Sequence, residues 1–177
     1  MGGDDSRPGE GYFPPDFRTW STPGRKRFDD FCDAMAPALE ARSLTLLFRP
    51  HARHVLSDPQ SCVSFLAARR GQPFSVILDP AGYITSSMLP RAEDHLARAF
   101  EALGPHPGAA ALALTNLEAV GNPDPLSGSE LRSAPLAKGL LSPATLAALA
   151  SKHWPAGRPM LLLDPAADSA VLAPTLR

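Results

Sequence analysis

Four short apolar runs, each followed by polar residues, constrain the fold of this chain more than any other feature. The runs cover residues 44–48, 74–78, 110–114 and 160–163. The segments before and between them carry apolar residues at helical spacing. Runs that are apolar at nearly every position are typical of strands buried on both faces, as in parallel sheets. The sequence therefore predicts an α/β protein in which about four parallel strands alternate with helices.

Helix signals support this alternation. Phe28, Cys32 and Met35 follow one another at spacings of three and four, which predicts a helix from Arg25 that Pro37 is expected to bend. The next helix is expected to open at Ser57-Asp58-Pro59, where a capping side chain precedes a proline. The polar residues 118–138 are expected to form a long loop, and a loop of that length in a compact domain suggests a lid or a binding loop.

The chain divides into two parts by composition. Residues 1–24 are rich in glycine, proline and charge, and they are expected to form a flexible N-terminal segment. Aromatic residues within this segment leave open a second interpretation, an arm that covers an exposed edge or a partner. Residues 25–177 are expected to form one α/β domain.

The composition excludes several classes of partner. The chain has 177 residues, of which 44% are hydrophobic and 20% charged, and its formal net charge is −1. Because no basic face is evident, neither nucleic acid nor an anionic membrane is expected as a partner. No apolar stretch approaches the roughly 20 residues that span a bilayer. Cys32 and Cys62 lack metal-ligand or redox spacing, so they are expected to be buried reduced thiols in a cytoplasmic protein.

The order of these segments resembles the C-terminal half of the xylose isomerase-like TIM barrels. That superfamily includes sugar phosphate isomerases and epimerases and the endonuclease IV type of AP endonuclease. The matching pieces, in chain order, are residues 44–51, Asp58-Pro59, residues 74–82, residues 93–104, residues 138–140 and residues 161–164. The resemblance implies that residues 25–177 form a partial (half) TIM barrel, since a complete barrel takes roughly 250 residues.

Half a barrel has edges and a face to cover. The expected covers are the chain's own N-terminal segment, a second copy in a homo-oligomer, or a complementary half-barrel subunit. Alternatively, the chain is a fragment of a longer barrel and has no function of its own.

The resemblance also implies a metal site, which this sequence has altered. Members of the superfamily usually hold a divalent cation in the barrel mouth, and the matching positions here are Arg49, Asp79, Ala113 (or Ala111 in a shifted register) and Asp164. Asp79 and Asp164 are therefore an incomplete set of metal ligands. A guanidinium only donates hydrogen bonds and would repel a cation, so Arg49 disfavours a divalent metal cofactor. Arg49 is expected to pair with Asp79 or Asp164 instead.

The candidate site residues lie just after the predicted strands, where parallel α/β proteins gather their functional groups. The catalytic candidates are His51, Asp79 and Asp164, and the substrate-binding candidates are Arg49, Tyr83, Asn116 and Lys138. Each also has an ordinary structural interpretation, such as a helix cap, a turn or an exposed side chain. His54 is expected to be a capping or surface histidine, and His95, His106 and His153 are expected to be solvated or locally hydrogen-bonded.

Two functions follow from this pattern. The first is a sugar phosphate isomerase/epimerase-like protein with a degenerate metal site, which acts on a small sugar or hydroxy acid together with a second subunit. The alternative is a noncatalytic binding or accessory subunit built on half a barrel. An endonuclease is disfavoured, because neither a rich metal cluster nor a surface for DNA is evident.

Overall fold

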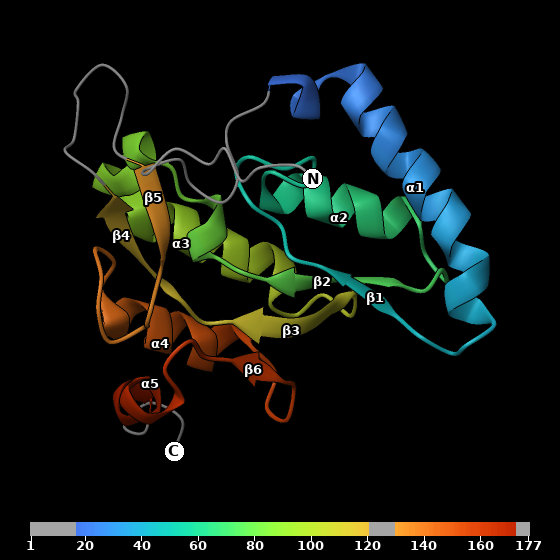
Figure 1. The fold of residues 1–177 in the computed structure, drawn as a ribbon. Helices are drawn as coiled ribbons and strands as arrows, with labels where there is room; N and C mark the ends of the chain where they lie inside the picture. Colours follow the sequence, from blue (N-terminus) through green and yellow to red (C-terminus); the bar gives the residue numbers. More distant parts are fainter. Residues whose placement is uncertain (1–16, 121–129, 173–177) are drawn as a thin grey trace, which may run out of the picture.

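A parallel four-stranded sheet forms the centre of the computed structural model, which describes residues 17–120 and 130–172. Its strands lie in the order β1-β2-β3-β6 (Figure 1). They are β1 (Leu46–Phe48), β2 (Phe74–Leu78), β3 (Ala109–Ala113) and β6 (Met160–Leu161). The prediction of about four parallel strands that alternate with helices is confirmed, and the first and last strands are shorter than their apolar runs.

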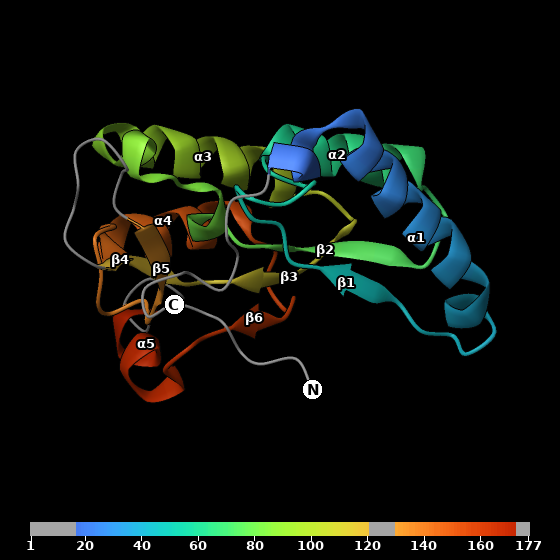
Figure 2. The ribbon, with the colours of Figure 1, turned by 45° about the horizontal axis from the view of Figure 1, so that its top comes forward.

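The main helices follow the alternation that the sequence predicted. They are α1 (Thr22–Glu40), α2 (Pro59–Ala68), α3 (Ala92–Leu103), α4 (Pro143–His153) and α5 (Pro165–Leu172). Three short 3₁₀ helices accompany them: η1 (Phe17–Trp20), η2 (Ala81–Tyr83) and η3 (Ser86–Arg91). Helices α1, α2 and α3 cover the same face of the sheet (Figure 2). No helix within the described ranges is both long enough and apolar enough to cross a membrane.

Local capping explains where the first two helices begin. Helix α1 begins three residues before the predicted Arg25, because the Ser21 hydroxyl accepts a hydrogen bond from the Gly24 N–H at 3.3 Å. Pro37 lies inside this helix. Residues 17–24, which the sequence assigned to a flexible segment, are therefore largely helical, while residues 1–16 lie outside the described part. Helix α2 begins as predicted, with a reciprocal capping box between Asp58 and Ser61.

The prediction of a long loop over residues 118–138 is wrong for residues 118–120 and 130–134, which form strands, and right for residues 135–138. Strands β4 (Asn116–Val120) and β5 (Glu130–Ala134) pair in an antiparallel hairpin, and residues 121–129 lie outside the described ranges. Glu118 stands directly opposite Arg132, and the two side chains form an ion pair at 2.7 Å. The strands are short, and Glu118 and Arg132 are exposed polar residues within them, which is why composition alone suggested a loop.

Aromatic rings join the helices to the sheet on the covered face. Phe65 of α2 is fully buried, and its ring centre lies 5.4 Å from that of Phe28 of α1 and 5.5 Å from that of Phe48 of β1. Phe74 of β2 completes the cluster at 6.3 Å from Phe65. Both cysteines, Cys32 and Cys62, are buried free thiols, as the sequence predicted.

The opposite face of the sheet, here termed the open face, carries exposed apolar side chains. Neighbouring side chains on a strand point to opposite faces. Because Phe48 packs into the core from β1, Leu47 points away from the helices, and the same holds for Leu161 and Leu163 beside the core residues of β6. These three leucines are 37%, 48% and 50% exposed. A parallel sheet is normally covered on both faces, so the open face is unusual for this architecture.

The aromatic cluster predicts a large difference between two phenylalanine deletions. Replacing buried Phe65 by alanine should lower the free energy of unfolding by about 3–5 kcal/mol, because it opens a cavity beneath two helices. Replacing Phe31 of α1, which is 46% exposed, should change it by no more than about 0.5 kcal/mol. Urea unfolding of both variants measures the difference, and similar values for the two would contradict this description of the core.

Candidate functional site

An ion pair between Arg49 and Asp79 lies at the carboxyl ends of β1 and β2. The alternation along these strands places both side chains on the open face. The Arg49 Nε donates to Asp79 Oδ2 at 2.7 Å, and Nη2 lies 2.7 Å from the same oxygen. The sequence left open whether Arg49 pairs with Asp79 or Asp164, and the structure shows the pair with Asp79. This charge-assisted contact joins two neighbouring strands at the rim.

The carboxylate of Asp79 is fully enclosed. Its side chain is 1% exposed, and its second oxygen, Oδ1, accepts hydrogen bonds from the Thr115 hydroxyl at 3.1 Å and the Gly82 N–H at 3.3 Å. Burial raises the pKa of Asp79, while the charge of Arg49 and the three sets of hydrogen bonds act in the opposite direction. Both carboxylate oxygens are therefore engaged within the protein.

The β4–β5 hairpin lies beside this pair. Ser133 of β5 accepts a hydrogen bond from Arg49 Nη2 at 3.2 Å. A small cavity of about 80 Å³ adjoins the contact, between His51, Gly82, Leu117 and Ser133. Pockets that hold organic ligands usually measure about 300–1,000 Å³, so this one accommodates only a few water molecules.

His51 lies on that cavity as a neutral imidazole. Its Nδ1 accepts a hydrogen bond from the backbone N–H of Arg53 at 3.1 Å, so Nε2 carries the proton in the neutral ring. Burial, with smaller contributions from His54, Arg53 and Arg49, lowers the pKa of His51 to about 4. The imidazole is therefore a weak base compared with an ordinary histidine.

Asn116 has a structural role that saturates its hydrogen-bonding capacity. Its amide nitrogen donates to the carbonyls of Leu136 and Leu141, and its oxygen accepts from the N–H groups of Leu117 and Leu141, at 2.8–3.1 Å. The side chain is fully buried and connects the end of β3 to the segment after β5. It has no donor or acceptor left for the substrate hydroxyls that the sequence assigned to it.

Tyr83 and Lys138, the other predicted binding residues, lie apart from the ion pair. The Tyr83 hydroxyl lies 3.3 Å from the Cys62 sulfur beneath α2, and burial raises its pKa. The Lys138 side chain is exposed in the segment between β5 and α4. Within the described ranges, neither side chain forms a hydrogen bond or an ion pair with Arg49 or Asp79.

Asp164 serves the helix that follows it. Its Oδ1 accepts a hydrogen bond from the Ala167 N–H at 3.2 Å, which caps the start of α5. The fully buried carboxylate of Asp168 in turn accepts from the backbone N–H of Asp164 at 3.1 Å. Asp164 therefore has the ordinary structural role of a helix cap, which was one of its two interpretations from the sequence.

The described residues do not fit a divalent cation. Residues 17–120 and 130–172 contain no group of three or more histidine, cysteine or acidic side chains placed to hold a metal ion. Asp79 already binds a guanidinium, and the position expected for a histidine ligand is occupied by Ala113, which has no ligating atom. A cation at this rim would meet the positive charge of Arg49 instead of a ligand.

The comparisons with known proteins define the architecture. No family model matches the sequence, and no curated protein does either. The structure is similar to a solved xylose isomerase-like TIM barrel protein from Mycobacterium smegmatis in complex with magnesium, with a TM-score of 0.54 at 10% sequence identity. The similarity covers 88% of this chain and 52% of that chain, so this chain spans about half the length of its match.

The fold is therefore that of a half TIM barrel, as the resemblance implied, and it is similar to about half of that xylose isomerase-like protein. At 10% identity the likeness extends to the fold and not to the chemistry. The candidate site is consequently described by the residues of this chain alone.

Two features of the rim were absent from the sequence prediction. Ser133 lies in the segment that was expected to be a loop, and only the hairpin brings it to Arg49. Thr115 lies just after β3, and its hydrogen bond to Asp79 follows from the strand order and not from any motif. The facing charges of Glu118 and Arg132 are the one sequence signal that pairs the hairpin strands.

The buried imidazole predicts a specific dependence of stability on pH. The unfolded state takes up a proton near pH 6.5 but folded His51 does so only near pH 4, so the free energy of unfolding should fall as the pH drops through that range. A His51→Gln variant should lose less stability over the same range. Urea unfolding at several pH values measures this, and an NMR titration that gives His51 a pKa near 6.5 would contradict it.

Proposed function

We propose that this chain is a noncatalytic binding or accessory subunit, a half barrel whose mouth is closed by an internal ion pair. The observation that carries the proposal is the enclosure of Asp79, both of whose oxygens are engaged by Arg49, Thr115 and Gly82. A carboxylate held in this way binds neither a cation nor a substrate unless Arg49 moves.

The other predicted catalytic groups support the same conclusion. An isomerase or epimerase needs a base whose pKa lies near the working pH and a group that stabilises negative charge on the substrate. The pKa of His51 is lowered to about 4, and Asp164 caps α5. The cavity between His51 and Ser133, at about 80 Å³, is too small for a sugar phosphate. The isomerase interpretation would therefore require a rearranged rim.

The open face supports an accessory role in an assembly. Leu47, Leu161 and Leu163 project from edge strands of a sheet that has helices on its other face. In a complete barrel, such side chains pack together in the interior. We propose that a second half barrel, either another copy of this chain or a separate polypeptide, covers them in the assembled protein.

Metal titration tests the proposal that the barrel mouth binds no divalent ion. The thermal unfolding midpoint of the wild-type chain should not rise with Mg²⁺, Mn²⁺ or Zn²⁺, because the described residues form no vacant ligand set at the rim. An Arg49→Glu variant, which places a second carboxylate beside Asp79, should be less stable and should regain stability with Mn²⁺. Saturable stabilisation of the wild type by a divalent ion, or isomerase turnover of a sugar phosphate, would contradict the proposal.

Light scattering after size exclusion tests the proposed assembly. If a second copy covers the open face, the wild-type chain should form dimers, and Leu161→Glu should shift them to monomers by burying a charge in the interface. Phe31→Glu, on the outer surface of α1, is the matched control and should leave the mass unchanged. A strictly monomeric wild-type chain would exclude self-association and leave a different half barrel as the partner.

A further inference from the structure

A second, larger cavity lies outside the rim, between the helices of the covered face. It measures about 570 Å³, which is within the range of organic-ligand pockets. Its walls come from η1, the first turn of α2, the segment that carries η2 and η3, and one side of α3. None of the residues of the Arg49–Asp79 network lines it, although it shares Ala52 and Thr85 with the small cavity beside His51.

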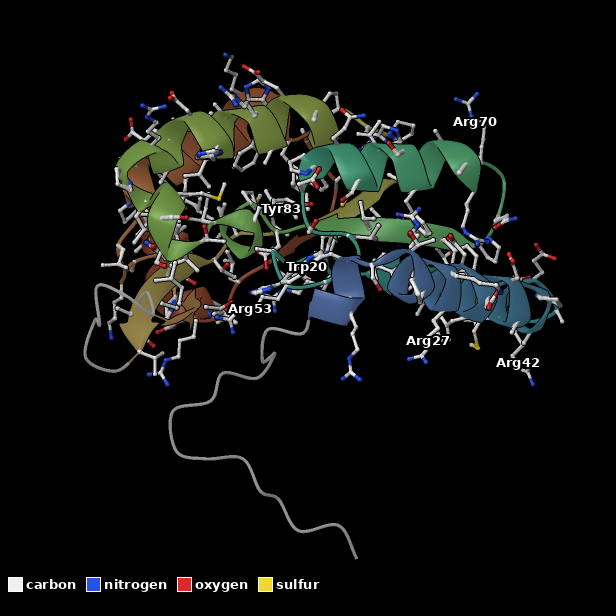
Figure 3. The ribbon with its side chains drawn as sticks, turned by 90° about the horizontal axis from the view of Figure 1, so that it is seen from above. Trp20, Arg27, Arg42, Arg53, Arg70 and Tyr83 are labelled. Atoms are coloured by element: carbon white, nitrogen blue, oxygen red, sulfur yellow. The ribbon has the colours of Figure 1, made fainter. Side chains whose placement is uncertain are left out.

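One wall of this cavity is aromatic and apolar. Trp20, Tyr83 and Met88 line it, and Figure 3 labels Trp20 and Tyr83 close to each other in the middle of the view. The indole of Trp20 is 48% exposed although it borders a hollow. The Tyr83 hydroxyl is held by Cys62, which leaves the ring as the part that borders the cavity. Flat rings of this kind stack well against another aromatic system.

The facing wall is cationic and has unused hydrogen-bonding groups. His95 and Arg98 stand three positions apart on α3, so they project from the same side of the helix. Within the described part of the chain, neither side chain forms a hydrogen bond or an ion pair, whereas Arg49, Arg69 and Arg132 all do.

The acidic group in the cavity wall is already engaged. Asp58 also borders the cavity, but its Oδ1 accepts from the Ser61 N–H at 2.9 Å and its Oδ2 from the Ser57 hydroxyl at 3.3 Å. It is therefore held as the cap of α2 and forms no ion pair with Arg98. The positive charge of Arg98 remains available to a ligand.

We propose that this cavity binds a planar aromatic molecule that carries one anionic group. The ring lies against Trp20 and Met88, and the anion accepts hydrogen bonds from Arg98, whose planar guanidinium suits a carboxylate, sulfonate or phosphate. The site goes beyond the proposed accessory role and does not depend on it. It gives the half barrel a ligand whose proposed contacts, Trp20, Met88 and Arg98, lie outside the Arg49–Asp79 network.

The probe 8-anilinonaphthalene-1-sulfonate tests this site, because it combines a fused aromatic ring with a sulfonate. Its fluorescence should rise on titration with the wild-type protein and saturate at one molecule per chain. Excitation of tryptophan should transfer energy to the bound probe, with a contribution from Trp20, which lines this cavity, whereas Trp154 at the end of α4 does not.

Matched variants separate this cavity from other apolar surfaces. Arg98→Gln should weaken binding of the sulfonate about tenfold, the effect of losing one charge-assisted hydrogen bond. Arg91→Gln, an exposed arginine outside the cavity, should leave binding unchanged. The uncharged analogue N-phenyl-1-naphthylamine should bind wild type and Arg98→Gln equally, and Trp20→Ala should weaken both probes.

The opposite results would overturn the proposal. Equal binding of the sulfonate to wild type, Arg98→Gln and Trp20→Ala would place the probe elsewhere, for example on the open face. If Arg91→Gln weakened sulfonate binding as much as Arg98→Gln does, the effect would come from the net charge of the protein and not from this cavity. Circular dichroism and thermal unfolding of each variant confirm that the fold is intact, and Arg98→Gln is expected to pass this control because Arg98 is exposed.

Discussion

The contact between Arg49 and Asp79 is the interaction on which the rim of this half barrel depends. A carboxylate that is 1% exposed needs a positive partner and hydrogen bonds to stay ionised, and Arg49 supplies the charge. The same guanidinium donates a hydrogen bond to Ser133 of the hairpin, and the carboxylate accepts one from the Thr115 hydroxyl just after β3. One ion pair therefore connects three parallel strands and the hairpin that lies over them.

The same strand alternation accounts for the rim and for the open face. It places Arg49 above Leu47 on β1, on the side of the sheet that the helices leave uncovered. In a complete barrel this side would be the interior, filled by side chains and closed by the remaining strands. In this half barrel, the ion pair engages the carboxylate at the mouth, and the sheet face below it carries exposed apolar side chains.

Sequence patterns predicted the buried strands better than the connections between them. The apolar runs of β2 and β3 identified the sheet, and the strong donor character of Arg49 predicted its pairing, since both depend on the side chains concerned. The hairpin was missed because its strands are short and half exposed. The structural role of Asn116 and the cavity beside Arg98 depend on contacts between distant segments, which no local pattern records.

A double-mutant cycle measures the central ion pair most directly. Arg49→Met, Asp79→Asn and the double variant are unfolded in urea, and the interaction free energy is the departure of the double change from the sum of the single ones. A stabilising coupling of about 1–3 kcal/mol is predicted, because Asp79 is buried and the hydrogen bonds are charge-assisted. Additive effects of the two substitutions would contradict the central role of this pair.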